Sequence, residues 1–488
     1  PTVRGRRTLV APDSSRKPST MRATAIAVAA AALLALFGWR RRPRLARQQR
    51  PLIPRAALQW AKVRARRHLL VLANLREVAG TLGVDIGGTL AKMVLLRRIR
   101  EGEKHERVSF GACFNTQPSL SFDVYADDGT SLTLHFVAAP TRSLAEAVET
   151  LRNCDGQPAA PAVESGPKSG PRLQRRESVY SSVRHVVAAG GGAHKYAALF
   201  EEVLRVRLVP FAELAALVEG LHFLRAVGPA DELYALPGPS PGGDGSGSAT
   251  TSGGEGGASE AAEERVAWEE VDFPYIVVNI GSGVSVLLLE REGCESPGEA
   301  RGVAAGGATF RRVGGTACGG ATFLGLGRAL TGVADYHKLL ALAEAGDASL
   351  VDTTVGDIYG EKGCAALGFP PSMTAVNFGA LAHGGEAPLP AKRHLAAAVL
   401  QLVVQASVLQ AMAHATPRGA ADRVLFVGGF LSDNQLARRL VANTARKLGG
   451  RALFSRHADF LGGLGSLAET LHRRAEGVSQ SARSDPHR

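Results

Sequence analysis

The sequence predicts an α/β fold made of two related halves, and two matching stretches carry that prediction. In the first, an apolar run leads through Asp85 into the turn Gly87–Thr89, and apolar residues resume at Met93. In the second, residues 275–289, an apolar run, a glycine and serine turn and another apolar run follow in the same order. Each stretch is typical of two strands joined by a tight turn whose glycines let backbone N–H groups approach an anion. Two such units predict an internal duplication, with a phosphate-binding turn from each half.

Length and charge set the class of protein. A chain of 488 residues with 45% hydrophobic residues can bury more than one core. The net charge of +12 is concentrated in residues 1–80, which hold 18 of the 57 basic and 2 of the 45 acidic residues. This leaves 39 basic and 43 acidic residues, a net charge of −4, over residues 81–488. A mildly acidic body lacks the electrostatic footprint of a nucleic-acid-binding protein, so no nucleic-acid partner is expected.

The cysteines exclude two further classes of site. Five cysteines are scattered along the chain with no C-x-x-C pair: Cys113, Cys154, Cys294, Cys318 and Cys364. An odd, scattered set is atypical of a zinc site or a disulfide framework. We therefore expect the folded body to lie in a reducing compartment.

Residues 1–80 form a basic extension with an apolar segment. Met21 is followed by the apolar run Ala23–Trp39 and then by three arginines, Arg40–Arg42. Seventeen residues are close to the lower limit for crossing a bilayer. A signal-anchor helix, an organelle transit peptide, a secretory signal and a mistranslated 5′ region remain open. The expected location is a cytoplasmic catalytic domain with membrane contact through residues 23–39, or else a mitochondrion or other organelle.

The first half, residues 81–274, alternates strand and helix patterns. Strands are expected at 132–137 and 183–187, and helices at 144–152 and 212–224. Composition rich in Pro, Gly and polar residues predicts disordered insertions at 156–176 and 237–264.

Two features of this half stand out as candidate site residues. The strand at 183–187 leads into a second close-approach turn, Gly190–Gly192, and then into a helical segment that ends near Val203. Glu213 lies in the first turn of the helix at 212–224, where the helix dipole favours a carboxylate. On the residues alone, Glu213 reads as an ordinary helix-start carboxylate.

The second half, residues 275–470, continues the pattern. A glycine-rich stretch, 311–323, is expected to lead into a helix at 324–330, and another helix is expected at 336–344. A long apolar helix at 391–415 is expected in the core or at an interface, and a helix is expected from Gly462.

The end of this half holds a third strand that stops at paired glycines. The strand at 424–427 leads into Gly428 and Gly429, and Ser432 and Asp433 are expected to cap the helix after it. Residues 471–488 are expected to be a disordered tail. Neither G-x4-G-K-[ST] nor a G-x-G-x-x-G that opens a helix after a first strand occurs, so Walker-type and dinucleotide folds are disfavoured.

These stretches, taken together and in order, resemble the eukaryotic-type (type II) pantothenate kinases of the actin, sugar-kinase and Hsp70 superfamily. The most specific are Asn279–Ser285, which reads N-I-G-S-G-V-S, and Gly314–Leu326, which reads G-G-T-A-C-G-G-A-T-F-L-G-L. The likeness covers nearly all of Gly83–Leu467. It implies duplicated ribonuclease-H-like domains, as in actin-like ATPases, with the active site in the cleft between them.

The resemblance implies transfer of the ATP γ-phosphoryl group to the primary hydroxyl of pantothenate, with Mg²⁺, as the first step of coenzyme A biosynthesis. By position, Asp85 is the implied Mg²⁺ residue and Glu213 the implied general base, with Arg312 also at the catalytic centre. The implied pantothenate contacts are Ser282, Ser285 and Arg312. The implied nucleotide contacts are Gly87, Gly88, Thr89, Lys92, Gly190, Gly191, Gly192, Gly281, Ser282, Gly428, Gly429 and Phe430.

The resemblance also implies partners and shows departures. An acyl-coenzyme A feedback inhibitor and a homodimer, or a heteromer with a paralogue, are implied. Ala189, His194 and Glu361 replace the family's usual Thr, aromatic residue and Gly. Two alternatives remain open: a catalytically weak or inactive regulatory subunit of a heteromeric pantothenate kinase, and a sugar or acetyl-hexosamine kinase of the same superfamily.

Overall fold

The computed structural model describes residues 81–98, 112–125, 131–153, 185–238, 263–291, 302–304, 308–382 and 388–484. All of them belong to one compact unit of the chain, Arg55–Arg488. The predicted targeting segment, the insertion at 156–176, most of that at 237–264, and two cysteines, Cys154 and Cys294, lie outside the described residues.

The first sheet is built around the first predicted hairpin. Its strand order is β3-β5-β2-β1-β6-β7, with β4 beside β5. β1 is antiparallel to β2 and parallel to β6, which in turn is parallel to β7. The strands are β1 Leu82–Ile86, β2 Leu90–Arg98, β3 Asn115–Thr116, β4 Phe122–Tyr125, β5 Ser131–Pro140, β6 His185–Ala189 and β7 Arg207–Phe211.

The second sheet is built around the second hairpin. Its strand order is β12-β13-β11-β10-β16-β17-β8-β9. β10 is antiparallel to β11 and parallel to β16, which is parallel to β17. The strands are β8 Leu233–Ala235, β9 Glu264–Val266, β10 Tyr275–Ile280, β11 Val284–Arg291, β12 Gly302–Ala304, β13 Ala308–Thr316, β16 Val424–Val427 and β17 Ala452–Ser455.

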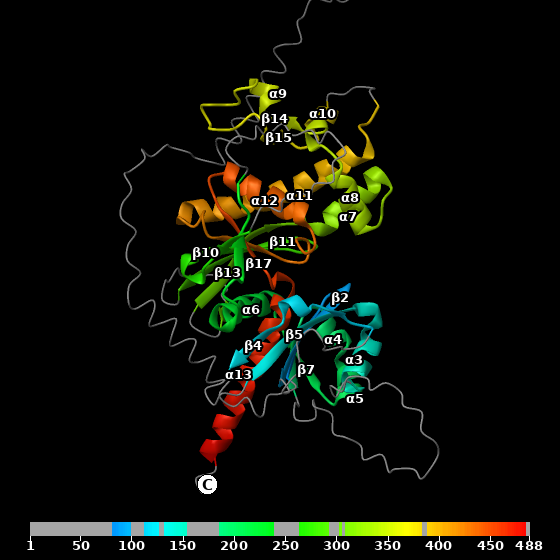
Figure 1. Cartoon of the computed structure of the whole chain (residues 1–488), viewed down its shortest axis with the longest axis vertical. Helices are drawn as coiled ribbons and strands as arrows, with labels where there is room; N and C mark the ends of the chain where they lie inside the picture. Colours follow the sequence, from blue (N-terminus) through cyan, green and yellow to red (C-terminus); the bar gives the residue numbers. More distant parts are fainter. Residues whose placement is uncertain are drawn as a thin grey trace, which may run out of the picture. The chain divides into compact units, whose positions relative to one another are not determined.

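The two sheets repeat one five-strand pattern. The order β5-β2-β1-β6-β7 corresponds to β13-β11-β10-β16-β17, with the same antiparallel and parallel pairings at each step. The predicted α/β fold with duplicated ribonuclease-H-like halves is therefore confirmed by strand topology. Figure 1 shows both sheets with their helices.

Helices cover the outer face of each sheet. α3 Leu144–Asn153 and α5 Ala197–Leu204 share a core with β1 and β6. α7 Gly320–Thr331, α8 Tyr336–Glu344, α11 Lys392–Ala415 and α12 Gln435–Lys447 share a core with β10 and β16. Within the described residues, one helical stretch, Lys392–Arg418, is long and apolar enough to cross a membrane. Because 72% of its apolar window is buried inside the protein, it is a core helix here, as predicted.

Two helices occupy the space between the inner faces of the sheets. α6 Glu213–Val227 packs along α13 Leu461–Ser484, and α13 also packs on β1 and β6 (Figure 1). Their apolar side chains join Val94 and Phe136 of the first sheet and Val277 and Leu289 of the second in a single cluster. The two halves therefore share a core.

This packing corrects the predicted domain boundary at residues 274 and 275. β8 and β9 precede that boundary but pair with β17 in the second sheet. α13 follows the second sheet but packs on the first. These segments join the half with which they make contacts distant in sequence: β8 and β9 pair at the edge of the second sheet, and α13 packs its apolar face on the first.

Three further local predictions are corrected. The predicted tail from residue 471 is helical as far as Ser484, because α13 continues past its buried Leu471. Asn434, and not Ser432 or Asp433, caps α12, since its side chain accepts the Ala437 N–H. α7 begins at Gly320, four residues before the predicted start, and the stretch before it, 308–316, is strand β13.

The remaining elements are short. They are α4 Gly192–Lys195, α9 Val355–Tyr359, α10 Gly379–Ala382, β14 Thr353–Thr354 and β15 Thr374–Val376, and the 3₁₀ helices η3 Pro118–Leu120, η4 Thr141–Ser143, η6 Trp268–Glu270, η7 Ala348–Leu350, η8 Thr416–Arg418 and η9 Ala458–Phe460.

The close approach of β1 and α13 makes a stability prediction. A Cβ added to Gly83 would lie 2.5 Å from the Leu467 nitrogen and would overlap the Gly463 carbonyl. Gly83→Ala should therefore lower the free energy of unfolding by about 1–3 kcal/mol, measured by urea denaturation. Gly325→Ala is the control, because that exposed glycine inside α7 has open space around it, and alanine there should add about 0.5–1 kcal/mol. Equal stability of Gly83→Ala and the unsubstituted protein would contradict the packing.

Candidate functional site

Asp85 lies where the first sheet, its glycine turns and α13 meet. It stands opposite Lys92 in the β1–β2 hairpin and beside Ala189 of β6. A Cβ added to Gly190 would lie 2.9 Å from Asp85 Oδ1, and one added to Gly462 would overlap Oδ2. Gly190 also has a φ of +80°, which L side chains rarely adopt. Glycine is thus required on both sides of this carboxylate.

The electrostatic environment of Asp85 identifies its charged neighbours. Burial raises the pKa of the Asp85 carboxyl above 3.8; Lys92 opposes this rise, and the negative charge of Glu213 adds to it. The charges of two other predicted residues, Lys92 and Glu213, therefore act on the Asp85 carboxylate. A cation or an additional donor at Asp85 would offset the cost of its half-buried charge.

The turn between β1 and β2 is held by hydrogen bonds to Thr141 on one side and is exposed to solvent on the other. Gly87 N–H donates to the Leu90 carbonyl at 3.0 Å. Thr141 donates its hydroxyl to the Gly87 carbonyl and its N–H to the Thr89 carbonyl, both at 2.9 Å. The residues of the turn, Gly87, Gly88 and Thr89, are exposed. Such a turn presents its outer backbone face to a ligand without rearrangement.

The second predicted turn, Gly190–Gly192, approaches the first strand closely. A Cβ added to Gly192 would overlap the Ile86 side chain, whereas Gly191 has open space around it. The Ala193 N–H closes the turn onto the Gly190 carbonyl at 3.2 Å. This turn and the hairpin turn therefore flank the same end of β1.

Lys92 connects this group to the turn that follows β16. Its Nζ lies 3.0 Å from Asp459 Oδ1, and a Cβ added to Gly429 would lie 3.8 Å from the same nitrogen. Ser432 donates its hydroxyl to that Asp459 oxygen. Asp459 and Ser432 were not among the predicted site residues. Their signal in the sequence is that each follows a buried strand, β17 or β16, at the carboxyl end where sites gather in such sheets.

The Gly428–Phe430 turn also contacts the second hairpin. Gly428 has a φ of +104° and approaches the Asn279 side chain and the Ile280 carbonyl. The Phe430 N–H donates to the Ile280 carbonyl at 3.1 Å, and the Phe430 carbonyl accepts from the Tyr336 hydroxyl at 3.1 Å. The Phe430 ring is buried against Phe323. Phe430 thus supports the turn from within the core, and the glycines form its outer part.

The second hairpin turn packs against the start of α7. Gly281 N–H donates to the Gly283 carbonyl at 2.9 Å, while the Gly320 N–H donates to the Gly281 carbonyl at 2.8 Å. The Ala321 N–H donates to the Ser282 carbonyl at 3.1 Å. Ser282 itself is exposed. The turn and the helix start are therefore one rigid unit.

Arg312 and Ser285, both predicted substrate contacts, meet on neighbouring strands. Arg312 Nε donates to Ser285 Oγ at 3.2 Å across β13 and β11. Gly315, with a φ of +154°, makes room for the guanidinium group. Arg312 remains exposed, so its other donors can bind a carboxylate as a planar fork.

The described residues that could hold a metal are few. No group of three or more His, Cys, Asp or Glu side chains forms a metal cluster among the described residues. Mg²⁺ in phosphate sites commonly uses one or two carboxylates, with water and phosphate oxygens completing its shell. Asp85, a desolvated carboxylate beside two glycine turns, fits that kind of site.

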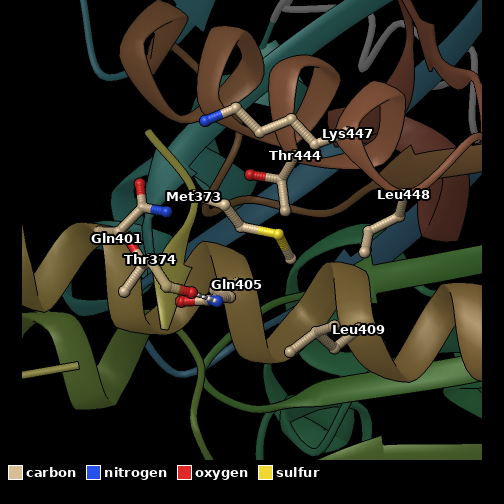
Figure 2. A pocket seen from close by; sticks show the side chains of 8 residues that line it. All are labelled: Met373, Thr374, Gln401, Gln405, Leu409, Thr444, Lys447 and Leu448. Atoms are coloured by element: carbon tan, nitrogen blue, oxygen red, sulfur yellow. Dashed lines mark hydrogen bonds between the residues drawn. The ribbon is translucent and has the colours of Figure 1, made fainter. Parts of the chain in front are cut away.

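A separate small pocket lies between α11, α12 and β15 (Figure 2). It is lined by Met373, Thr374, Gln401, Gln405, Leu409, Thr444, Lys447 and Leu448. Gln405 donates to the Thr374 carbonyl at 3.0 Å, and Lys447 donates to the Ser372 carbonyl at 3.1 Å. Burial lowers the pKa of Lys447. None of the predicted site residues line this pocket.

Comparison with protein families gives one match over most of the chain: a family model described as Fumble matches residues 81–469. The chain is 27% identical over 415 residues to pantothenate kinase 2 of Oryza sativa subsp. japonica, covering 82% of this chain and 39% of that protein. It is 26% identical over 398 residues to pantothenate kinase 1 of Arabidopsis thaliana, covering 79% and 84%. It is 25% identical over 404 residues to the 4′-phosphopantetheine phosphatase of Mus musculus, covering 81% and 41%.

The length of the relatives and the low similarity to solved structures limit what these matches show about this chain. The chain spans 39% of the length of the rice and Arabidopsis proteins named pantothenate kinase 2. Among solved structures, it is similar to the activator of the 2-hydroxyisocaproyl-CoA dehydratase from Clostridium difficile with bound ADPNP, at a TM-score of 0.38 and 12% identity, covering 82% of this chain and 97% of that one. Because this TM-score is low, the assignment of the fold rests on the strand order of the two sheets.

The raised pKa of Asp85 predicts a pH-dependent cost to stability. The folded state holds the Asp85 proton more tightly than the unfolded chain, so stability from this group is present below pH 3.8 and is lost as pH rises through the raised pKa. Asp85→Asn should therefore raise Tm at pH 7.5, and the gain should shrink as the pH falls.

Thermal unfolding at several pH values measures this effect. Asp422→Asn is the control, because the Asp422 side chain is 67% exposed and its loss should change Tm little at any pH. A lower Tm for Asp85→Asn at pH 7.5 would contradict a net cost of the buried charge.

Proposed function

Because this chain belongs to the Fumble family, we propose that it is an ATP-dependent pantothenate kinase that phosphorylates the primary hydroxyl of pantothenate to 4′-phosphopantothenate, the opening step of coenzyme A biosynthesis. The observation that carries the proposal is the position of the Asp85 carboxylate, which lies opposite Lys92 and against Gly190 of the second glycine turn, with the charge of Glu213 acting on it. The Arg312–Ser285 pair supplies a separate place for an anionic substrate.

Phosphoryl transfer depends mainly on positioning and on neutralising charge. Lys92 would bind phosphate oxygens, and the exposed turn Gly87–Thr89 would present backbone donors to them. Asp85 would hold Mg²⁺, which neutralises phosphate charge when it is bound. Gly428 and Gly429 would border the nucleoside, since neither has a side chain of its own and Gly429 is exposed.

Glu213 is the proposed general base. It is the first residue of α6, it is exposed, and it influences the charge of Asp85. Its role would be to accept the hydroxyl proton as the phosphoryl group is transferred.

Arg312 is the proposed anchor for the carboxylate end of pantothenate. Its Nε is occupied by Ser285, which fixes the plane of the guanidinium group. The remaining N–H groups can then bind a carboxylate in one defined orientation. Ser282, exposed on the neighbouring turn, would supply a further hydroxyl contact.

A turnover assay with Mg-ATP and pantothenate tests the proposal directly. Release of ADP that depends on pantothenate is expected, with little release on sugars or acetyl-hexosamines. Binding of ATP without turnover would favour the regulatory subunit of a heteromer, and activity on a hexosamine alone would favour the sugar-kinase alternative. The mouse relative named as a phosphatase makes this assay necessary, because it shows that related chains carry names of different activities.

Glu213→Gln should lower kcat by about 10²-fold or more, because the amide cannot accept the proton. The KM for ATP should change little. Steady-state kinetics with varied ATP and pantothenate measures both values. Glu202→Gln on the exposed face of α5 is the control and should keep the original rate. A near-normal rate for Glu213→Gln would exclude the general-base role.

Arg312→Lys should raise the KM for pantothenate by about tenfold or more, because a lysine loses the planar fork that a charged hydrogen-bonded pair requires. The KM for ATP should stay the same. Arg311→Lys is the matched control: the neighbouring strand residue faces the other way and lies 3.6 Å from Glu290. An equal change in both variants would point to a general effect on β13 and against substrate binding by Arg312.

A further inference from the structure

Lys92, which the proposed function gives to phosphate binding, already has an anionic partner within the protein. Its Nζ lies 3.0 Å from Asp459 Oδ1, and the two side chains are 18% and 31% exposed. Lys92 lies on β2 of the first sheet. Asp459 lies on η9, the 3₁₀ helix that follows β17 of the second sheet. The ion pair therefore occupies Lys92, the one basic side chain among the described residues that are assigned to the phosphate site.

Asp459 is held in place by its surroundings. The Ser432 hydroxyl donates to the same carboxylate oxygen that Lys92 contacts. Two residues before Asp459, the buried His457 ring binds the Glu232 carboxylate through Nδ1 and lies 2.7 Å from the Leu120 carbonyl through Nε2. One residue after it, Phe460 is buried in the shared core. The carboxylate is thus fixed toward Lys92 by both ends of its short helix.

A phosphate that binds Lys92 must contend with this carboxylate. Two like charges a few ångströms apart repel each other, and partial burial weakens the screening by water and salt. Lys92 carries a single positive charge, so it cannot neutralise both anions. A phosphate at Lys92 therefore competes with Asp459 for the same positive charge.

We propose that Asp459 is an internal anion that occupies Lys92 when nucleotide is absent and lowers the affinity of the site for ATP. It is a positioning residue, because it acts through Lys92 and not on the reacting atoms. This inference rests on the proposed function, in which Lys92 binds phosphate. Ser432 strengthens the effect by holding Asp459 in position, and the phosphate of a nucleotide would compete with Asp459 for Lys92.

The test is Asp459→Asn, which removes the charge and keeps the size and the acceptor oxygen. The Kd for Mg-ATP, measured by calorimetry, and the KM for ATP should each fall about two- to fivefold, as expected for the loss of a partly exposed ion-pair partner. The kcat and the KM for pantothenate should not change. The difference from the unsubstituted protein should shrink in about 0.5 M salt, because screening weakens both the pair and the repulsion.

Two further variants make the result specific. Asp433→Asn removes a neighbouring negative charge but not the partner of Lys92; its φ of +48° is tolerated by asparagine. It should leave the Kd for ATP unchanged. Ser432→Ala keeps the Asp459 charge but frees the carboxylate, and it should shift the Kd in the same direction as Asp459→Asn by a smaller factor. A thermal melt of each variant checks that the fold is intact.

The outcomes separate this inference from the proposed function. Unchanged or weaker ATP binding by Asp459→Asn, in a protein that phosphorylates pantothenate, would overturn the role of Asp459 alone. An equal gain in Asp433→Asn would also overturn it, because the general negative field would then suffice. Failure of the unsubstituted protein to bind Mg-ATP at all would overturn both.

Discussion

The packing of α13 between the two sheets is the constraint on which the candidate site depends. α13 lies against β1 and α6, and its apolar side chains belong to the core that both sheets share. The start of this helix brings Gly462 against the Asp85 carboxylate, and the 3₁₀ helix just before it brings Asp459 to Lys92. Its partner α6 places Glu213 at its own first turn. The helix pair thus brings Glu213 and Asp459 to the two charged residues of the β1–β2 hairpin, Asp85 and Lys92.

Glycines make this packing possible, because they let backbones approach without side chains between them. Gly83 of β1 faces the Gly463 carbonyl, Gly220 of α6 faces Leu461, and Gly465 of α13 faces the Ala216 carbonyl. In each case an added Cβ would overlap backbone atoms, which cannot move aside as a flexible side chain can. Because Gly83 and Asp85 lie two residues apart on β1, they face the same side of the sheet. The close contact between Gly83 and α13 therefore also turns the Asp85 side chain toward α13.

Local patterns in the sequence were sufficient for the hairpins, for most helices and for the duplication. The strand pair around Gly87–Thr89, the helix starting at Glu213 and the Arg312–Ser285 region all follow from periodicity, glycine turns and the family resemblance.

Long-range contacts could not be derived in that way. Asp459 is 367 residues from Lys92, and neither residue's neighbourhood in the sequence points to the other. The prediction of which half contains β8, β9 and α13 was wrong for the same reason. Pairing at a sheet edge and burial between two sheets produce no periodic pattern in the local sequence. The Asn434 cap was missed because three consecutive polar residues, 432–434, can each cap a helix, and only tertiary structure selects one.

Under the proposed function, the balance of charge at the site gives a reason for the nucleotide to bind together with a cation. Burial and the negative charge of Glu213 raise the pKa of Asp85, and Asp459 adds a third carboxylate beside the ammonium group of Lys92. Once these carboxylates are ionised, the empty site carries more negative than positive charge. A polyphosphate would meet repulsion from this site if it arrived alone. A divalent cation at Asp85 would reverse the sign of the local field, because it would neutralise the carboxylate whose burial is already costly. Under the proposed function, the same carboxylates that disfavour free phosphate would select for the metal complex, and the exposed Gly87–Thr89 turn would present its backbone to it.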